Sequence, residues 1–405
     1  MRQGVMILWM VVVAIFGVIL TYMRKIDKEK LYIIGAFLCF TLTNYWILTM
    51  DTHFFGYASD WDFGDITGFV NSYSQMNLYG SEYPPIALIC YRLFKRFSIL
   101  DLENDGKAIR YALTLFFLIA FSGIIVFIRK ILEKKEVVHS DAMAICLLMS
   151  GPLLFAMERG NLIVYALLFT LIFIYYQESE KQYQRYFAGF SLALAANLKF
   201  YPAIFGLVLI KKKQWKEAFV ALTSGIMIYF LPALILKDIS VLQFYKTFTG
   251  IEVSGDSLNS TLALKYACIR GLGKYGVNDT ILKLFGNIAV ILFLIVSIWV
   301  FFKAREQEQE YLMLTMLMIY IPGISFWYVV AFLIIPFLFY DFKARDITSN
   351  VKLIIYMSIL YFVFGKGRLW FLYPGKGQFR IFFLWFFTII SFAYYQLTRK
   401  GESNE

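Results

Sequence analysis

The chain has 405 residues, of which 60% are hydrophobic and 19% aromatic, and 39 basic against 28 acidic residues give a formal net charge of +11. Soluble globular domains are nearer half apolar, and here the excess falls in blocks of about twenty residues, which excludes a soluble domain and predicts a polytopic helical membrane protein. In such a protein the positive charge indicates basic cytoplasmic loops rather than nucleic acid binding.

Residues that commonly hold metals or disulfides are few. Only His53 and His139 are present, which excludes a multi-histidine zinc site. The four cysteines are far apart in the sequence and no pair has metal-ligand spacing, so we interpret them as small hydrophobic residues. They are Cys39, Cys90, Cys146 and Cys268. The sequence predicts no metal ligands and no certain cofactor, and a divalent metal is left as an alternative.

Basic clusters recur along the chain and orient it. They are Arg24-Lys25, Lys28, Lys30, Arg129-Lys130, Lys134-Lys135, Lys211-Lys212-Lys213, Lys216, Lys303, Arg305, Lys343, Arg345 and Arg399-Lys400. When all of them are assigned to the cytoplasm, an even number of crossings separates each pair, as the positive-inside rule requires. The amino terminus is then outside and the carboxy terminus inside.

The predicted fold is an all-α, polytopic transmembrane helical bundle that forms one integral membrane domain over residues 1–405 in the cell membrane. Its first apolar run, which ends at Met23, is too long for a cleaved signal peptide and has no small-residue cleavage site after it, so we interpret it as a retained helix. The predicted spans, about eleven in number, are 5–23, 31–50, 111–128, 141–157, 162–177, 217–236, 282–302, 311–326, 327–340, 351–364 and 381–397.

The first long outer loop, residues 51–110, holds an unusual acidic cluster of Asp60, Asp62 and Asp65. Charge close to a bilayer is costly, so three carboxylates within six positions need a reason. Such a carboxylate can take a proton from an attacking hydroxyl or hold a metal that helps a phosphate to leave. The plain alternative is a solvated loop in which Asp65 caps a helix.

The same loop ends in Tyr83-Pro84-Pro85, followed by a short amphipathic stretch, Ile86–Phe97. Two prolines at the start of an apolar helix fix the direction in which the chain enters the helix, and this alone explains their presence structurally. The stretch is too short for a confident span, so it either lies along the membrane interface or dips into the bilayer.

Glu158-Arg159-Gly160-Asn161 separates two predicted spans on the outer side. An ordinary polar turn with an internal ion pair explains it without any function. Arginine is nevertheless the preferred partner of a pair of phosphate oxygens, so Arg159 is a candidate ligand for a phosphate.

Residues 186–210 form an ambiguous segment, because the basic residues at both of its ends favour the cytoplasm. Lys199-Phe200-Tyr201-Pro202 interrupts its middle, and the proline breaks the helical hydrogen-bond ladder. A re-entrant hairpin of two half-helices with Lys199 at its tip satisfies both facts. Broken helices at membrane depth are tolerated where they line a protein cavity, so the tip indicates a site in which Lys199 either binds a phosphate or extends to the interface.

Two further outer segments carry basic residues. The loop 237–281 contains Asn259-Ser260-Thr261 at the start of a helix that also holds Lys265 and Arg270. Gly365-Lys366-Gly367-Arg368 begins a basic, glycine-rich loop that opposes the charge rule, and lipid headgroups or a lipid-linked phosphate would compensate for it.

The order of these motifs resembles that of glycosyltransferase family 87, whose members are polytopic enzymes of the GT-C superfamily. The resemblance covers roughly residues 50–275 and depends most on Tyr83-Pro84-Pro85 and on Lys199-Phe200-Tyr201-Pro202. It implies transfer of a sugar, often mannose, from a polyprenyl-phosphate donor to a glycan or glycolipid acceptor on the outer face, with an aspartate of the first outer loop as general base. The family often has glutamine where this chain has Asn161, and Asn-Gln-Ser where it has Asn259-Ser260-Thr261.

From these motifs and the family resemblance we predict a sugar transfer that inverts the configuration of the anomeric carbon. Asp62 is the preferred base, with Asp60 and Asp65 as alternatives, and Lys199 and Arg159 hold the donor phosphate with help from Arg270 or Arg368. The remaining predicted substrate-binding residues are Tyr83, Glu158, Tyr201 and Asn259. The main alternative function is a transporter or flippase for a lipid-linked glycan, and a third is a glycan polymerase or ligase.

Overall fold

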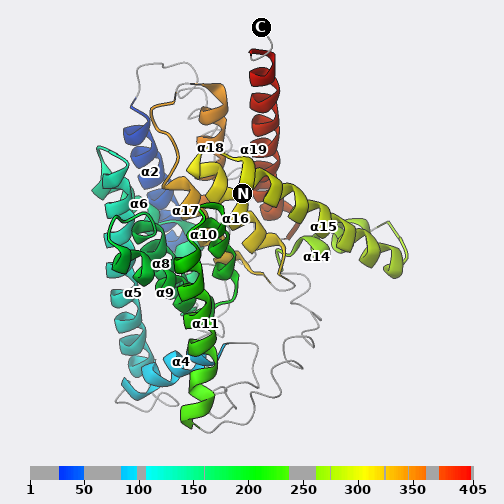
Figure 1. Ribbon diagram of the computed structural model, residues 1–405. Helices are drawn as coiled ribbons and strands as arrows, with labels where there is room; N and C mark the ends of the chain where they lie inside the picture. The colour runs from blue at the N-terminus through cyan, green and yellow to red at the C-terminus, as the bar shows by residue number, and fades with distance from the viewer. Residues whose placement is uncertain are drawn as a thin grey trace. The chain divides into compact units, whose positions relative to one another are not determined.

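The structure is a computed structural model that describes residues 27–49, 84–97, 106–158, 160–236, 261–273, 275–322, 325–344, 346–361 and 374–402. Every regular element in these ranges is a helix, which confirms the all-α prediction (Figure 1). Among the described residues one helix, α15 (Asp279–Lys303), is long and apolar enough to cross a membrane. Shorter apolar helices occur at Ile163–Tyr176, Tyr201–Lys211, Trp327–Phe337, Ile347–Tyr361 and Ile381–Tyr394.

The chain divides into two compact units, each of which is described by itself. Unit 1 consists of Met1–Tyr57, Leu132–Pro152 and Gly255–Glu405, and unit 2 of Ala58–Ile131 and Leu153–Ser254. The predicted span 5–23 lies outside the described residues.

Unit 2 is built around three helices that pack side by side: α8 (Ile163–Tyr176), α9 (Gln182–Leu198) and α11 (Trp215–Leu236). The backbones of α9 and α11 approach closely at Gly189, where an added Cβ would lie 2.9 Å from the carbonyl oxygen of Glu217. A side chain at this position would force the two helices apart. The short helix α4 (Pro85–Phe97) packs against both α9 and α11. α5 (Gly106–Lys134) and α7 (Gly151–Glu158) also have residues in this unit.

Residues 186–210, which were predicted to contain a broken helix, are interrupted at Lys199, as expected. α9 ends at Leu198, Lys199 is extended with φ −148° and ψ 130°, and the chain continues as the 3₁₀-helix η2 (Tyr201–Gly206) and the short helix α10 (Leu207–Lys211). Pro202 lies in the first turn of η2, where its missing N–H leaves no helical hydrogen bond unmade. We call residues 182–211 the first hairpin.

The two ends of the first hairpin lie together, so the chain returns to the side from which it entered. Gln214 Nε2 donates a hydrogen bond to the carbonyl of Gln177 at 3.0 Å, and Arg185 Nε lies 2.8 Å from Glu217 Oε1. At the α-helical rise α9 is about 25 Å long, which is less than the ~30 Å hydrocarbon core of a bilayer. The described residues therefore form the predicted hairpin with Lys199 at its tip, and its entry into a membrane stays a prediction.

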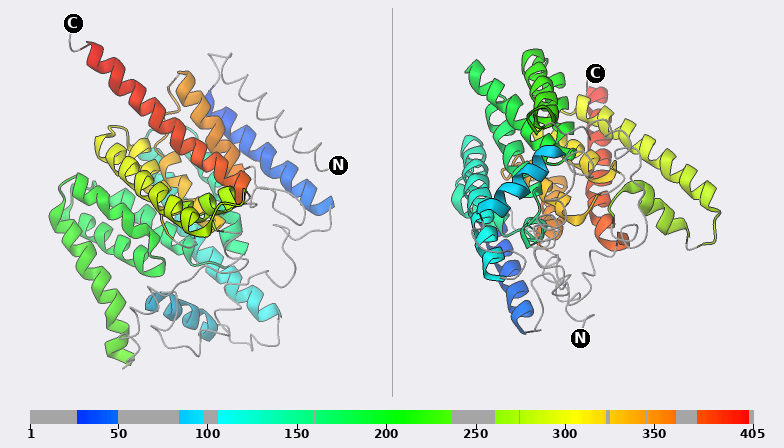
Figure 2. Two further views of the ribbon diagram at one scale, coloured as in Figure 1. Left: turned by 90° about the vertical axis from the view of Figure 1, so that its right-hand side faces the viewer. Right: turned by 90° about the horizontal axis from the view of Figure 1, so that it is seen from below.

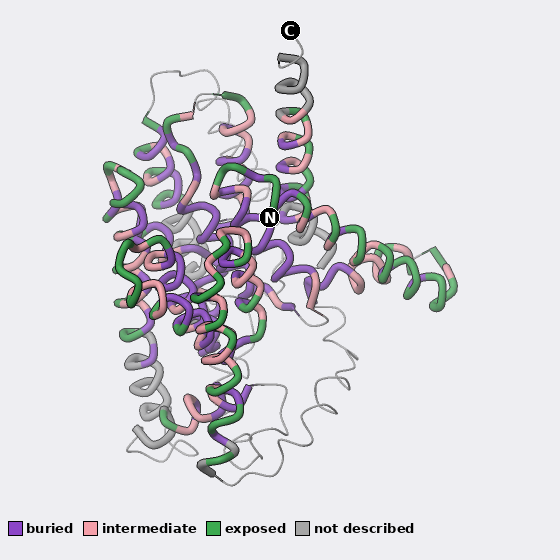
Figure 3. The backbone as a smooth tube through the Cα atoms, in the orientation of Figure 1, coloured by how far each residue is buried: buried purple, intermediate pink, exposed green. Residues whose placement is uncertain are grey.

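Unit 1 contains α2 (Lys28–Thr49), α6 (Ser140–Leu148) and a set of carboxy-terminal helices. The latter are α14 (Leu264–Gly273), α15, α16 (Gln307–Tyr320), η4 (Trp327–Leu333), α17 (Ile334–Phe337), α18 (Ile347–Tyr361) and α19 (Pro374–Glu402). α18 packs against α2 and α19, and the three helices run side by side in Figure 2. Nearly all of α16 is buried, whereas α15 exposes most of its length (Figure 3).

Two predicted spans differ from the structure. The span 141–157 is two short helices, α6 and α7, because Pro152 begins a new helical turn. The span 327–340 is the 3₁₀-helix η4 followed by the four-residue α17, and together they rise about 20 Å, too little to cross a bilayer. In a continuous α-helix the ring of Pro336 would clash with the carbonyl of Phe332, which explains why the residues before it are not α-helical.

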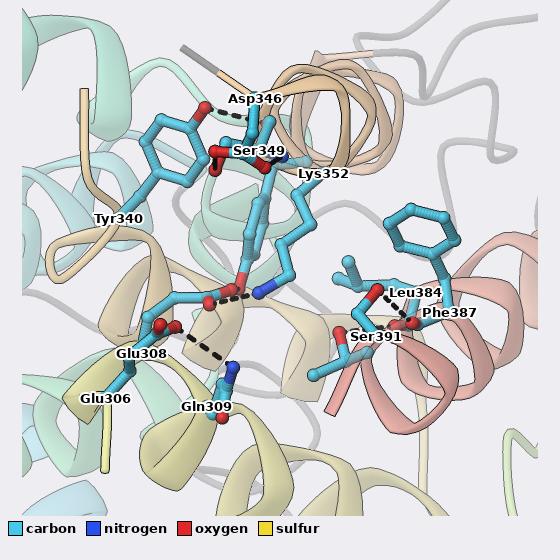
Figure 4. Close-up of polar contacts among 12 residues, drawn as sticks. Glu306, Glu308, Gln309, Tyr340, Asp346, Ser349, Lys352, Leu384, Phe387 and Ser391 are labelled. Carbon is cyan, nitrogen blue, oxygen red and sulfur yellow. Dashed lines mark hydrogen bonds and ion pairs between the residues drawn. The ribbon is translucent and has the colours of Figure 1, made fainter. Parts of the chain in front are cut away.

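η4 and α17 instead fold back along α16, and we call residues 307–337 the second hairpin. At its base the carboxylate of Glu308, in the first turn of α16, forms an ion pair with Lys352 of α18 at 2.7 Å (Figure 4). Tyr356 OH donates to the other oxygen of the same carboxylate at 2.9 Å. Glu308, Lys352 and Tyr356 are all buried.

This buried ion pair predicts a stability effect. Lys352→Met should lower the free energy of unfolding by about 3–5 kcal/mol, because it leaves a carboxylate buried without its cation. Adding Glu308→Gln should restore part of the loss. The measurement is the unfolding midpoint of the purified protein in detergent, with Lys343→Met as control because its pair with Glu136 is exposed. An equal loss in the single and double variants would contradict the explanation.

Candidate functional site

The tip of the first hairpin is held in place by hydrogen bonds within the end of α9 and by one to α11. Asn197 Nδ2 donates to the carbonyl of Ala193 at 2.9 Å and to the carbonyl of Gly225, in α11, at 3.1 Å. The N–H of Lys199 donates to the carbonyl of Ala195 at 3.1 Å. These bonds fix the backbone at the point where the helix stops, and Lys199 there is only 6% exposed.

An open apolar groove of about 770 Å³ runs from this tip between the first hairpin and α11. Asn197 and Phe200 line it near the tip, and Tyr229 of α11 lies 6.3 Å from Phe200 between ring centroids. The other lining residues are almost all aliphatic, alanine or glycine. The volume is within the range of small-molecule sites, and the lining suits a hydrocarbon chain.

Two further sequence motifs meet beside α9. Tyr91, in α4, lies with its hydroxyl 3.5 Å from the carbonyl oxygen of Gly160 and 3.4 Å from the N–H nitrogen of Leu162. Gly160 has φ +63°, a left-handed conformation that favours glycine. The side-chain oxygen of Asn161 accepts a hydrogen bond at 3.0 Å from the N–H of Ile163, the first residue of α8. The turn after Arg159 is therefore fixed against the helix that Pro84-Pro85 begins.

Unit 1 holds the other described candidate, Arg270 of α14. Its Nη2 donates to the carbonyl of Thr261 at 2.9 Å. The hydroxyl of Thr261 in turn donates to the carbonyl of Ser325 and accepts from the N–H of Ser325, both at 3.1 Å. Partial burial lowers the pKa of the Arg270 guanidinium to about 10, so it remains protonated at neutral pH.

The structure brings only some of the predicted site residues together. Lys199 and Tyr201 lie at the same hairpin tip in unit 2, and Arg270 belongs to unit 1. Glu158 is the last residue of α7, and only its backbone is described. The candidates outside the described residues are Asp60, Asp62, Asp65, Tyr83, Arg159, Asn259 and Arg368.

The groups that could hold a metal are sparse where the structure is described. Those ranges contain no cluster of three or more histidine, cysteine, aspartate or glutamate side chains, and the acidic cluster lies beyond them. Cys90, Cys146 and Cys268 are free thiols. Burial raises the pKa of the Cys268 thiol, which keeps it protonated.

Sequence reasoning missed several residues that organise these regions. Tyr91 was not singled out, because one tyrosine in an amphipathic stretch gives no signal. Ser325 lies two residues after Pro322-Gly323, a dipeptide that marks a break and could have revealed the second hairpin. The partnership of Thr261 with Ser325 joins residues 64 positions apart, so no local pattern predicts it.

Comparison with curated proteins gave no match, and comparison with solved structures gave none either. The family model of glycosyltransferase family 87 matches residues 82–336, which is more than half of the chain. The match begins after Asp60, Asp62 and Asp65. It extends beyond residue 275, where the resemblance was expected to end, and includes the first hairpin and all but the last residue of the second. The chain therefore belongs to glycosyltransferase family 87 and is a glycosyltransferase.

Proposed function

We propose that the protein transfers a sugar from a polyprenyl-phosphate donor to a glycan or glycolipid acceptor on the outer face of the cell membrane. Residues 1–405 then form one multi-pass membrane domain, with the outer loops 51–110 and 237–281 carrying the site. Mannose is the sugar that the family resemblance favours.

The surface of several helices supports a multi-pass arrangement. α15 is strongly apolar, yet only 28% of its most apolar window is buried, unlike a core helix of a soluble protein. Large apolar side chains are exposed on other helices as well, among them Leu118, Ile119, Phe187, Phe190, Phe219, Leu222, Met227, Leu234, Phe386 and Ile390. Soluble proteins rarely expose so much apolar surface, whereas a bilayer would cover it.

The observation that carries the donor assignment is the burial of Lys199 at the tip of a broken hairpin, beside an apolar groove. A polyprenyl phosphate is an anion joined to a hydrocarbon chain, and this site pairs a cation with an apolar surface. Ionisable groups at membrane depth are costly to bury and mark substrate pathways. We assign the phosphate to Lys199 and the first isoprene units to the groove.

The proposed reaction is a single displacement. Asp62, or else Asp60 or Asp65, takes the proton of the acceptor hydroxyl while its oxygen attacks the anomeric carbon of the donor. The bond from that carbon to the phosphate oxygen breaks, and the sugar configuration inverts. The electron pair leaves with the polyprenyl phosphate, whose added charge Lys199 and Arg159 stabilise. We assign Tyr83, Glu158, Tyr201, Asn259, Arg270 and Arg368 to substrate binding.

The test is an assay of the purified protein in lipid nanodiscs with a labelled polyprenyl-phosphate mannose and membrane glycolipids as acceptors. We expect release of free polyprenyl phosphate together with a labelled product, and both should depend on the acceptor. Absence of release from every polyprenyl-phosphate sugar tried, with transfer from nucleotide sugars instead, would overturn the donor assignment. Movement of intact lipid-linked glycan across the bilayer without cleavage would favour the transporter alternative.

A further inference from the structure

The wall of the apolar groove in unit 2 contains one amide side chain. Among the described residues that line the groove, Asn197 and Tyr229 are the two whose side chains carry a polar group, and the others are apolar or glycine. Asn197 is only 5% exposed, and it lies two residues before Lys199, near the end of α9. A buried polar side chain in an apolar wall is costly unless its donors and acceptors are paired. The partners of the amide therefore decide what this residue does.

The nitrogen of this amide is used entirely within the protein. It donates to two main-chain carbonyls, that of Ala193 at 2.9 Å and that of Gly225, in α11, at 3.1 Å. With the amide reversed, its oxygen would face the same two carbonyl oxygens, so these bonds fix which side of the amide is the acceptor. No residue in the described part of the chain donates a hydrogen bond to the side-chain oxygen, Oδ1. Asn197 therefore adds a fixed hydrogen-bond acceptor to an otherwise mostly apolar wall.

The chemistry of this acceptor selects the part of a substrate that can meet it. An isoprene chain has no hydrogen-bond donor, and an ionised phosphodiester has acceptor oxygens only. The hydroxyl groups of the sugar are therefore the donors that a polyprenyl-phosphate sugar offers. The sugar is bonded directly to the phosphate, and two residues of an extended chain span at most about 7 Å. A phosphate held by Lys199 can therefore have its sugar in contact with Asn197.

We propose that Asn197 is a specificity-determining residue whose Oδ1 accepts a hydrogen bond from one hydroxyl group of the donor sugar. This inference rests on the proposed polyprenyl-phosphate donor, and it assigns the recognition of the sugar to a residue that the proposed function leaves without a role. A sugar that lacks this hydroxyl, bound in the same place, leaves a buried acceptor without a partner and is rejected. Lys199, by contrast, binds the phosphate that all such donors share.

The experiment measures the affinity of the full-length protein in nanodiscs for polyprenyl-phosphate mannose and for its monodeoxy forms, each of which lacks one hydroxyl group. At least one monodeoxy form should bind the wild type about ten- to hundredfold more weakly than the parent, the range for leaving one buried acceptor unpaired. In Asn197→Ala the ratio for a single monodeoxy form should fall to about one, because both deletions remove the same hydrogen bond. The ratios for the other forms should stay at their wild-type values.

Ser191→Ala is the matched control, and it should leave every ratio unchanged. Ser191 is a buried polar residue of the same helix, but its hydroxyl donates to the carbonyl of Phe187 at 2.8 Å, and it is not among the residues that line the groove. Asn197→Ser is the second variant, because serine can donate to the carbonyl four residues earlier, as Ser191 does, but has no amide oxygen. It should lose the same single ratio as Asn197→Ala.

Three results would overturn the inference. They are equal binding of the parent and every monodeoxy form by the wild type, an equal loss for all forms in both Asn197 variants, and an effect confined to the KM of the acceptor. Binding is measured without turnover, so a wild type that binds these donors but transfers no sugar would refute the proposed function while the ratios still judge Asn197. Transfer with ratios that neither Asn197 variant changes would refute the inference alone.

Discussion

Replacing Asp62 by asparagine is expected to lower kcat by about 10²- to 10⁴-fold, the usual contribution of a general base. Asparagine keeps the size of the side chain but cannot accept the proton of the acceptor hydroxyl. KM for the donor should change little, because the base acts on the acceptor. The measurement is steady-state transfer from a polyprenyl-phosphate sugar by protein purified in nanodiscs.

Asp60→Asn and Asp65→Asn are the matched controls, because they remove the same charge from the same loop. One of the three variants alone should lose activity, and we expect it to be Asp62→Asn. Full activity of all three, in protein that inserts and folds normally, would refute the assignment of the base to this loop. Equal partial losses would instead indicate that the loop acts through its summed charge.

Replacing Lys199 by methionine has the second-largest expected effect. Methionine fills a similar volume but carries no charge, so it tests the cation rather than the packing at the buried hairpin tip. We expect kcat/KM for the donor to fall by about 10²- to 10³-fold, as when a fixed group that stabilises leaving charge is removed. Binding of free polyprenyl phosphate should weaken as well.

Lys211→Met is the control for Lys199→Met, because Lys211 ends α10 at the opposite end of the same hairpin. It should retain activity. Lys199→Arg should keep part of the activity, since charge is preserved but the guanidinium has a different reach and geometry. If Lys199→Met binds polyprenyl phosphate as the wild type does, the tip of the first hairpin is not the phosphate site.

The sequence predicted the first hairpin because both of its causes are local. Basic residues at its ends favour one side of the membrane, and Pro202 after Lys199 prevents a continuous helix. The second hairpin was predicted as two full spans, 311–326 and 327–340. Its return leg is as apolar as a span, and apolar composition alone does not distinguish a helix that crosses from a buried segment that folds back. The effect of Pro336 on the residues before it depends on backbone geometry.

The candidate site likewise has residues that the sequence predicted and residues that it did not. Lys199, Arg159 and the acidic cluster could be selected from the sequence because charge next to apolar runs is conspicuous. The partners that organise the site could not be selected from the sequence. Asn197 reaches Gly225 across 28 positions, Tyr91 lies against Gly160 across 69, and Thr261 holds Ser325 across 64. Each is a polar residue of ordinary type in an apolar neighbourhood, and its role exists only once the helices are packed.

The helical class, the break at Lys199 and the likeness to a glycosyltransferase family could be predicted from the chain alone, and the orientation implied by the basic clusters stays a prediction. These properties follow from composition, charge and proline positions, which act over a few residues. The packing of the helices adds that an apolar groove runs from the tip of the first hairpin along α11, and that Thr261 contacts both Ser325 and Arg270. Helix packing and main-chain hydrogen bonds between distant segments produce these features, and neither leaves a local pattern in the chain.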